Sequence, residues 1–349
     1  MAQTAAEALN AASEQLAAAD GARDRVRALT ATVQAYENGL AAMRGGMRRA
    51  AIREDQLRRQ LQSRDTEIGQ LLAVLQSVSP DAAPTTFLHP DGPEGTARAG
   101  MLLAELVPSL GQRANRLRQD LEDVETLRLL QEDAAARLQR GLAEVQSART
   151  ALSQAMAERT DLPRRFTADP VRTALLIASA ETLDAFSSGL TEITGEEAAW
   201  APPDLNARIG TLTAPVRGLL LRRAGEADAA GIARPGILLA TRPGALVTSP
   251  TEATIRYVGP LLDFGTVIIL EPRPGTLFVF AGLGATYGSA GDIIAEGTPL
   301  GLMGAAGATI RSTGGEGAGA GLTETLYMEV RQDNVTEDPL GWFDIDRNG

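Results

Sequence analysis

The chain of 349 residues contains no cysteine, no lysine and only one histidine, His89. The absence of cysteine excludes disulfide bonds and thiolate metal sites. With a single histidine, the chain cannot form a zinc site that needs two imidazoles. Arginine carries all of the positive charge, and we interpret this as a bias of genome composition rather than a functional choice.

Three further absences concern the environment and partners. The formal net charge is −11 and no basic stripe with interleaved aromatic residues occurs, so we expect no nucleic-acid partner. No run of about 18 apolar residues is present, and the sequence therefore predicts no transmembrane segment. The first residues, Ala2-Gln3-Thr4-Ala5 after the methionine, do not resemble a signal peptide, so we expect that any such leader has been removed.

Aromatic residues are scarce in the first half of the chain, which is rich in Ala, Leu, Arg, Gln and Glu. Residues 205–349 are instead rich in Gly, Val, Ile, Thr and Pro. The first composition is typical of long helices and the second of short strands joined by tight turns. The sequence therefore predicts an α+β protein with a helical N-terminal part and a sheet domain after it.

Apolar residues in the helical half recur at alternating spacings of three and four, which is typical of a coiled coil. We expect a first helix that has a weak point at Gly45-Gly46 and stops near Ser79-Pro80, because glycine and proline disfavour helix. A loop containing His89 follows, and a long helical stretch returns along the first. The sequence thus predicts an antiparallel coiled-coil hairpin over residues 1–165. The first series consists of Val26, Leu29, Val33, Tyr36, Leu40, Met43 and Met47.

A small apolar patch is expected near residues 96–112. Its stripe is wider than a coiled-coil seam requires, which indicates either a short helix that packs sideways or a docking surface for a partner. The spacing does not distinguish the two. The central residues of the patch are Leu102, Leu103, Leu106 and Val107.

Residues 166–205 form a separate segment between proline-rich joints. An amphipathic helix is predicted over residues 170–197, before Ala201-Pro202-Pro203. It could be ordinary core or a removable cover over the following domain. Its apolar residues include Leu175, Leu176, Leu183, Phe186 and Leu190.

Residues 206–349 alternate short β-rich runs with Gly or Pro turns, which predicts a small, mainly antiparallel sheet domain. The order of these runs resembles the LytM domain of the lysostaphin-type zinc peptidases, which cleave cell-wall peptide bridges. The resemblance rests on Pro215 to Gly218, the strand at Gly236, Phe264-Gly265, the run ending at Glu271, Gly291, Gly297 to Leu300, and Leu326 to Arg331.

In active members of that family, the metal ligands are a His, an Asp four residues later and the second His of a His-x-His motif. The resemblance places Arg234, Leu238 and Tyr327 at these positions, and Thr325 at that of the assisting first His. Zinc sites need about three protein ligands with N, O or S donors. We therefore expect no metal, no cofactor and no peptidase activity by the family mechanism.

A degenerate LytM domain, a coiled coil and an intervening amphipathic helix together resemble the EnvC-type murein hydrolase activators. This resemblance implies a periplasmic protein that docks through its coiled coil on the FtsX periplasmic domain of the FtsEX complex. It implies a LytM groove that binds and activates N-acetylmuramoyl-L-alanine amidases in septal peptidoglycan splitting. It also implies that residues 170–197 occlude this groove until the partner releases them.

The resemblance assigns an amidase-binding groove to Leu238, Phe264, Val267, Phe280, Tyr327 and Arg331. Leu238 and Val267 could equally be sheet core. Tyr327 and Arg331 share a strand face with Thr325 and Glu329, and these polar side chains predict that the face opens into a groove.

Two other functions stay open from the sequence. One is a coiled-coil scaffold whose LytM-like domain binds peptidoglycan without activating an amidase. The other is a zinc endopeptidase of the cell wall, which the replaced ligand positions disfavour.

Overall fold

The computed structural model describes residues 2–63, 69, 92–159, 162–166, 169–192, 204–228, 231–304 and 323–345. The chain divides into two compact units. Residues 38–144 belong to one, and residues 3–37 and 145–349 belong to the other. The predicted domain borders near residues 165 and 205 stay predictions, and His89 lies outside the described residues.

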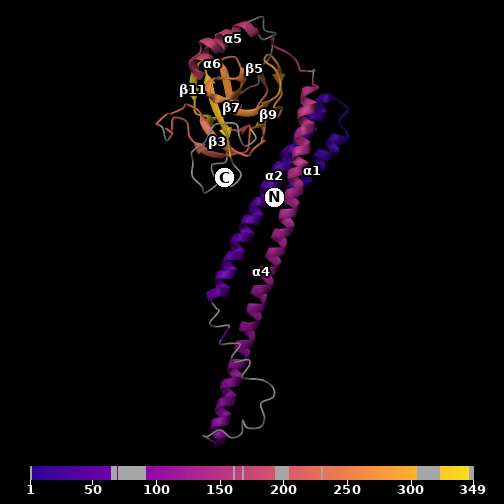
Figure 1. Ribbon diagram of the computed structural model, residues 1–349, viewed down its shortest axis with the longest axis vertical. Helices are drawn as coiled ribbons and strands as arrows, with labels where there is room; N and C mark the ends of the chain where they lie inside the picture. Colours follow the sequence, from indigo (N-terminus) through magenta and orange to yellow (C-terminus); the bar gives the residue numbers. More distant parts are fainter. Residues whose placement is uncertain are drawn as a thin grey trace. The chain divides into compact units, whose positions relative to one another are not determined.

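The N-terminal part of the chain is helical, with α1 (Ala2–Ala17), α2 (Ala22–Ser63) and α4 (Gly92–Ala157). Figure 1 shows α2 and α4 as long rods. Helix α2 runs without interruption through Gly45 and Gly46, where we expected a weak point. Among the described helices, none is long and apolar enough to cross a membrane.

The region near residues 96–112 is helical and belongs to the continuous helix α4, and how its apolar patch packs stays a prediction. Pro108 lies inside this helix. A proline removes one backbone hydrogen bond, but the flanking turns of a 66-residue helix keep theirs, so the helix continues. The side chains of Leu102, Leu103, Leu106 and Val107 lie outside the described part of the structure.

Helices α2 and α4 contact each other within each unit. In the first unit, Gln131 Nε2 donates a hydrogen bond of 2.9 Å to Glu54 Oε2. In the second, Arg149 Nη2 donates a hydrogen bond of 2.8 Å to Glu37 Oε1, which also accepts one of 3.1 Å from the backbone N–H of Leu246. These contacts place the two helices together, and the finer prediction of a coiled-coil hairpin stays a prediction.

The sheet domain is built around one antiparallel sheet with the strand order β2-β3-β10-β7-β6-β5-β8. Strand β11 pairs with β10, and β4 pairs with β9, which also pairs with β7. A small parallel pair joins β1 to β12. The strands are β1 (Leu212–Thr213), β2 (Leu219–Arg222), β3 (Ile237–Thr241), β4 (Leu246–Thr248), β5 (Ala253–Pro260), β6 (Thr266–Arg273), β7 (Thr276–Thr286), β8 (Ile293–Ile294), β9 (Pro299–Met303), β10 (Glu324–Gln332), β11 (Val335–Glu337) and β12 (Phe343–Asp344), with 3₁₀ turns at Asn206–Arg208, Leu262–Phe264 and Pro339–Gly341.

Both faces of this sheet are apolar and covered. One face packs against residues from the beginning and the end of the sheet domain, among them Leu212, Trp342 and Phe343. The other face packs against α5 (Pro170–Ser179) and α6 (Leu183–Glu192), and Figure 1 shows both helices beside the sheet. Burial on both faces explains why the central strands read as continuous apolar runs.

The described part of the segment predicted as a single helix over residues 170–197, residues 170–192, forms two helices. Asp169 caps α5, because its Oδ1 accepts hydrogen bonds from the backbone N–H of Val171 and Arg172 at 3.0 and 3.1 Å. Ala180 is extended, and Thr182 Oγ1 then accepts a hydrogen bond of 3.1 Å from the N–H of Ala185, as a helix N-cap does. The apolar periodicity persisted across this break, so it concealed the new cap.

Candidate binding site on the covered face of the sheet

Of the four positions that the resemblance assigns to the metal site, Arg234 lies just before β3, Leu238 lies in β3, and Thr325 and Tyr327 lie in β10. Tyr327 and Leu238 are register partners on these neighbouring strands, as are Thr325 and Ala240. Strand pairing thus brings together residues about 90 positions apart in sequence, as the family arrangement requires.

These side chains do not fit zinc. Arg234 is a cation and Leu238 has no donor atom. Burial and the neighbouring Glu329 carboxylate raise the pKa of Tyr327, so its phenol stays protonated and does not offer a phenolate. In the part of the chain that the structure describes, no group of three His, Cys, Asp or Glu side chains could hold a metal ion.

A buried polar network replaces such a site. Tyr327 Oη accepts a hydrogen bond of 3.1 Å from the N–H of Gly236 and donates one of 2.5 Å to Glu329 Oε2. Arg331 Nη1 donates a hydrogen bond of 2.9 Å to Glu329 Oε1. Glu329 and Arg331 are each only 1% exposed, so the pair compensates two charges that the sheet face removes from water.

Arg331 also connects the sheet to α6. Its Nη2 donates a charge-assisted hydrogen bond to Asp184 Oδ1 and a second one, of 3.0 Å, to the backbone oxygen of Asn334. The Asp184 side chain is 70% exposed, whereas that of Arg331 is 2% exposed. The contact therefore lies at the edge of α6, where solvent reaches one partner and not the other.

Aromatic contacts extend the network on the opposite side. Phe264 is half-buried, with its ring centroid 5.2 Å from that of Tyr327. The Arg234 guanidinium lies over the Phe264 ring, 4.8 Å from its centroid. A cation over an aromatic face is attracted by the ring quadrupole. This edge of the site thus combines an aromatic surface with a fixed positive charge.

The apolar residues of α6 close the site. Leu183, Phe186 and Leu190 are buried against the same sheet face. Phe186 is fully buried, and its ring meets that of Tyr257 edge to face at 4.8 Å between centroids. Burial raises the pKa of Tyr257, whose hydroxyl donates a hydrogen bond of 2.7 Å to the Pro260 oxygen.

Most of the residues predicted to line the amidase-binding groove lie on the sheet face that packs against α6. Leu238, Phe264, Val267, Tyr327 and Arg331 lie there, and Val267 and Leu238 also belong to its apolar packing. The alternation along β10 predicted an open face, but Thr325, Tyr327, Glu329 and Arg331 are buried and α6 packs on the same face.

Two predicted residues lie elsewhere. Phe280 packs in the cluster on the opposite face of the sheet, so its assignment to the groove was wrong. In β7, Leu277, Val279 and Ala281 face α6, and alternation turns Phe278 and Phe280 away from it. Leu175 of α5 does not cover the sheet either, because it is 70% exposed, whereas Leu176 packs against the covered face.

Three residues of the site were missed from the sequence. Asp184 and Tyr257 lie far from the motifs in the chain, and only the fold shows their contacts with Arg331 and Phe186. Glu329 was placed on the correct face by alternation, but its bond to Tyr327 was not predicted. No signal in the sequence identified these contacts.

Comparisons with known proteins agree with this fold. Residues 233–339 match Peptidase family M23. No curated protein matches the chain. Similar solved structures include Helicobacter pylori Csd3, at 18% identity over 38% of this chain and 35% of that one, with a TM-score of 0.31.

Two other structures are similar to a comparable extent. A zinc-containing peptidase from Vibrio cholerae is 20% identical over 43% of this chain and 42% of that one, with a TM-score of 0.31. The structure of the SpoIIQ-SpoIIIAH pore-forming complex contains a chain 19% identical over 38% of this chain and 91% of that one, with a TM-score of 0.30. The chain spans about a third of the length of Csd3. It thus carries a Peptidase family M23 domain of LytM type at residues 233–339.

Proposed function

We propose that this protein is a non-catalytic activator of periplasmic N-acetylmuramoyl-L-alanine amidases, which act in septal peptidoglycan splitting. In this proposal, the sheet face under α6 binds the amidase and the α5–α6 segment is autoinhibitory. The observation that carries the proposal is that α6 packs on the sheet face that also holds Tyr327 and Leu238, two positions to which the resemblance assigns the metal of active relatives. Asp184 of α6 also bonds Arg331 on this face. There the chain has an apolar and aromatic surface in place of a ligand set.

The proposed absence of catalysis rests on the chemistry of these side chains. Zinc peptidases need ligands that hold the metal and leave one position open for water. Arg234 and Leu238 supply no ligand, and the protonated Tyr327 hydroxyl is already bonded to Glu329. The same residues make a good surface for a protein partner, because aromatic, apolar and arginine side chains dominate interface hot spots.

The geometry of α6 suggests what the amidase presents. Helix α6 places Leu183, Phe186 and Leu190 on the sheet and Asp184 on Arg331. A partner helix with the same apolar spacing and one carboxylate could replace each of these contacts. We therefore infer that the amidase binds with an amphipathic helix that competes with α6.

We propose that the coiled coil and FtsEX control whether the α5–α6 segment covers the sheet face. The resemblance implies that the FtsX periplasmic domain docks on the helical part, and we propose the patch of Leu102, Leu103, Leu106 and Val107 as its contact. The patch lies on α4, at the end remote in sequence from the α5–α6 segment. A partner that binds one state of this helix better than the other would shift the equilibrium of the cover.

The test is dye release from labelled peptidoglycan by a cognate amidase in the presence of the full-length chain. We expect little stimulation by the unchanged chain and strong stimulation by the Asp184→Asn/Phe186→Ala double variant. These changes weaken α6 binding but leave the sheet face intact. Val171→Ala, on the exposed side of α5, is the matched control.

A third variant places the amidase site. Phe264→Ala in the double-variant background should abolish the stimulation, and its fold should persist because Phe264 is only half-buried. Unchanged stimulation would contradict the assignment of this face. Dye release by the chain alone would instead indicate an enzyme, and wall binding without stimulation would indicate a scaffold.

A further inference from the structure

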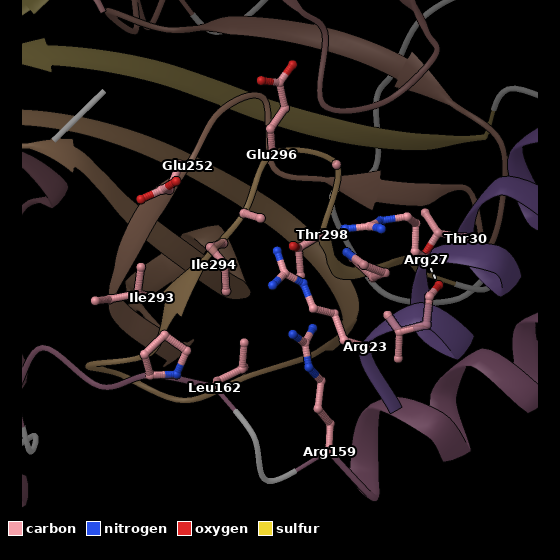
Figure 2. Close-up of a pocket in the computed structure, with 15 residues that line it drawn as sticks. Arg23, Arg27, Thr30, Arg159, Leu162, Glu252, Ile293, Ile294, Glu296 and Thr298 are labelled. Atoms are coloured by element: carbon pink, nitrogen blue, oxygen red, sulfur yellow. Dashed lines mark hydrogen bonds between the residues drawn. The ribbon is translucent and has the colours of Figure 1, made fainter. Parts of the chain in front are cut away.

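A cavity lies apart from the sheet face that α6 covers. The start of α2, the segment after α4 and the turn between β8 and β9 line it (Figure 2). Its volume is about 230 Å³. All of its lining residues belong to the same compact unit. It shares no residue with the site under α6, so its function can be tested independently of the proposed activator role.

Arginine side chains dominate one side of this cavity. Arg23 and Arg27 come from α2, and Arg159 follows α4. Figure 2 shows the guanidinium groups of Arg23 and Arg159 pointing into the same space, near the side chain of Thr298. Each guanidinium has five N–H donors, so an arginine that already makes a contact can still donate to a ligand. A carboxylate between two converging guanidinium groups is attracted by both.

The two carboxylates of the lining lie apart from Arg23 and Arg159. Glu296 accepts two hydrogen bonds from Arg208, at 2.7 and 2.9 Å. In Figure 2, Glu252 lies on the other side of the cavity from Arg23 and Arg159. Arg27 pairs with Asp24 at 3.5 Å, so Arg23 and Arg159 are the candidates for binding a ligand.

The opposite wall is apolar. Leu162, Ile293 and Ile294 lie there, with the Glu252 side chain at its rim (Figure 2), and Val26, Pro163 and Pro299 also line the cavity. A free phosphate dianion would lose its hydration against this wall without gaining a partner there. A carboxylate on a short aliphatic group would satisfy both sides, because guanidinium groups bind carboxylates in a planar fork and the wall accepts the aliphatic part.

From these features, we propose that the cavity is a binding site for a small aliphatic carboxylate, such as the C-terminal end of a short peptide. The carboxylate accepts hydrogen bonds from Arg23 and Arg159, and the aliphatic group lies on Ile293 and Ile294. Because Arg23 belongs to α2 and Ile293 to β8, the bound ligand would join a helix to the sheet domain.

Calorimetric titration of the full-length chain at low ionic strength tests this site, with N-acetyl-Ala-Ala as the probe. The same dipeptide with a C-terminal amide is the matched control ligand, since it differs only in the charged group. We expect the free acid to bind at least about tenfold more tightly than the amide, because hydrogen bonds to a charged group contribute about 1.5–3 kcal/mol. Inorganic phosphate, titrated separately, should bind more weakly than the acid.

Arginine variants test whether the free acid binds in this cavity. Arg23→Gln and Arg159→Gln should each weaken binding of the acid about tenfold or more. Arg137→Gln, an exposed arginine of α4 that pairs with Asp133 at 2.8 Å, should leave it unchanged. Unfolding midpoints of the variants show that each is folded. No binding of the acid, equal binding of the amide, tighter binding of phosphate, or affinity unchanged in both glutamine variants would each overturn the proposal.

Discussion

The α5–α6 segment should open locally, and Phe186→Ala should make that opening far more frequent. Phe186 is fully buried between α6 and the sheet, with its ring 4.8 Å from that of Tyr257. Replacing a buried phenylalanine by alanine costs about 3–5 kcal/mol. At about 1.4 kcal/mol per factor of ten, even the lower end raises the open population about 100-fold.

The absence of cysteine gives a direct assay. Ser187 is fully buried on α6 and its hydroxyl has no hydrogen-bond partner among the residues that the structure describes, so Ser187→Cys introduces a small, protected thiol at little cost. In this background we expect Phe186→Ala to raise the rate of thiol labelling about 100-fold. Leu175→Ala, an exposed leucine of α5, should leave the rate unchanged.

A second thiol separates local opening from global unfolding. Ala253→Cys places a thiol in the buried core on the other face of the sheet. If α6 opens by itself, Phe186→Ala should accelerate labelling at position 187 without a matching change at position 253. Equal acceleration at both positions, or an effect under about tenfold at position 187, would refute the local opening of α6.

Three further predictions concern the sheet domain, at Arg331, Tyr327 and Gly291. Arg331→Ala should lower the free energy of unfolding by about 3–5 kcal/mol, because it leaves the Glu329 carboxylate buried without its cation; the Arg331→Met/Glu329→Gln double variant should lose less, as urea unfolding can show. The raised pKa of Tyr327 means that the folded protein retains its phenolic proton above the ordinary value near 10, so stability is fully present below that pH and falls as the pH rises above it. Tyr327→Phe should make this decline shallower in unfolding curves between pH 8.5 and 11, and an unchanged slope would refute the assignment. Gly291→Ala should destabilise the chain by at least about 1–2 kcal/mol, since φ there is +95° and an added Cβ would lie 2.0 Å from the Phe166 oxygen. A melting temperature equal to that of the unchanged chain would contradict this prediction.

The sequence predicted the order of helices followed by an antiparallel sheet, because periodicity of three and four, or of two, survives in long segments. It also predicted that Tyr327 and Arg331 share a face, since β10 alternates polar and apolar residues. It failed for Phe280, because the run Leu277 to Phe280 is apolar on both faces and alternation there carries no information about side.

Other errors have equally local causes. The apolar stripe across residues 170–197 concealed the Thr182 cap that starts α6 as a separate helix. The bond between Asp184 and Arg331 joins residues 147 positions apart, and no local pattern encodes such a pairing. The polar character of Thr325, Tyr327, Glu329 and Arg331 predicted an open groove, but all four are buried. Tyr327, Glu329 and Arg331 bond one another, and Arg331 also bonds Asp184 of α6.

The way in which the cover is attached limits how it can be released. The chain before α5 is fixed to the sheet, because the N–H of Arg165 donates to the Gly291 oxygen and that of Ile293 donates to the Pro163 oxygen, both at 2.8 Å. Arg165 also bonds Glu271 in the buried interior at 2.7 Å. Removal of α6 therefore need not disturb this attachment. Helix α5 exposes Val171 and is held less firmly, so the hinge of the cover is expected between residue 166 and the start of α6. A signal from the helical part must then act on α5 itself, because a pull transmitted through the chain would meet the fixed segment first.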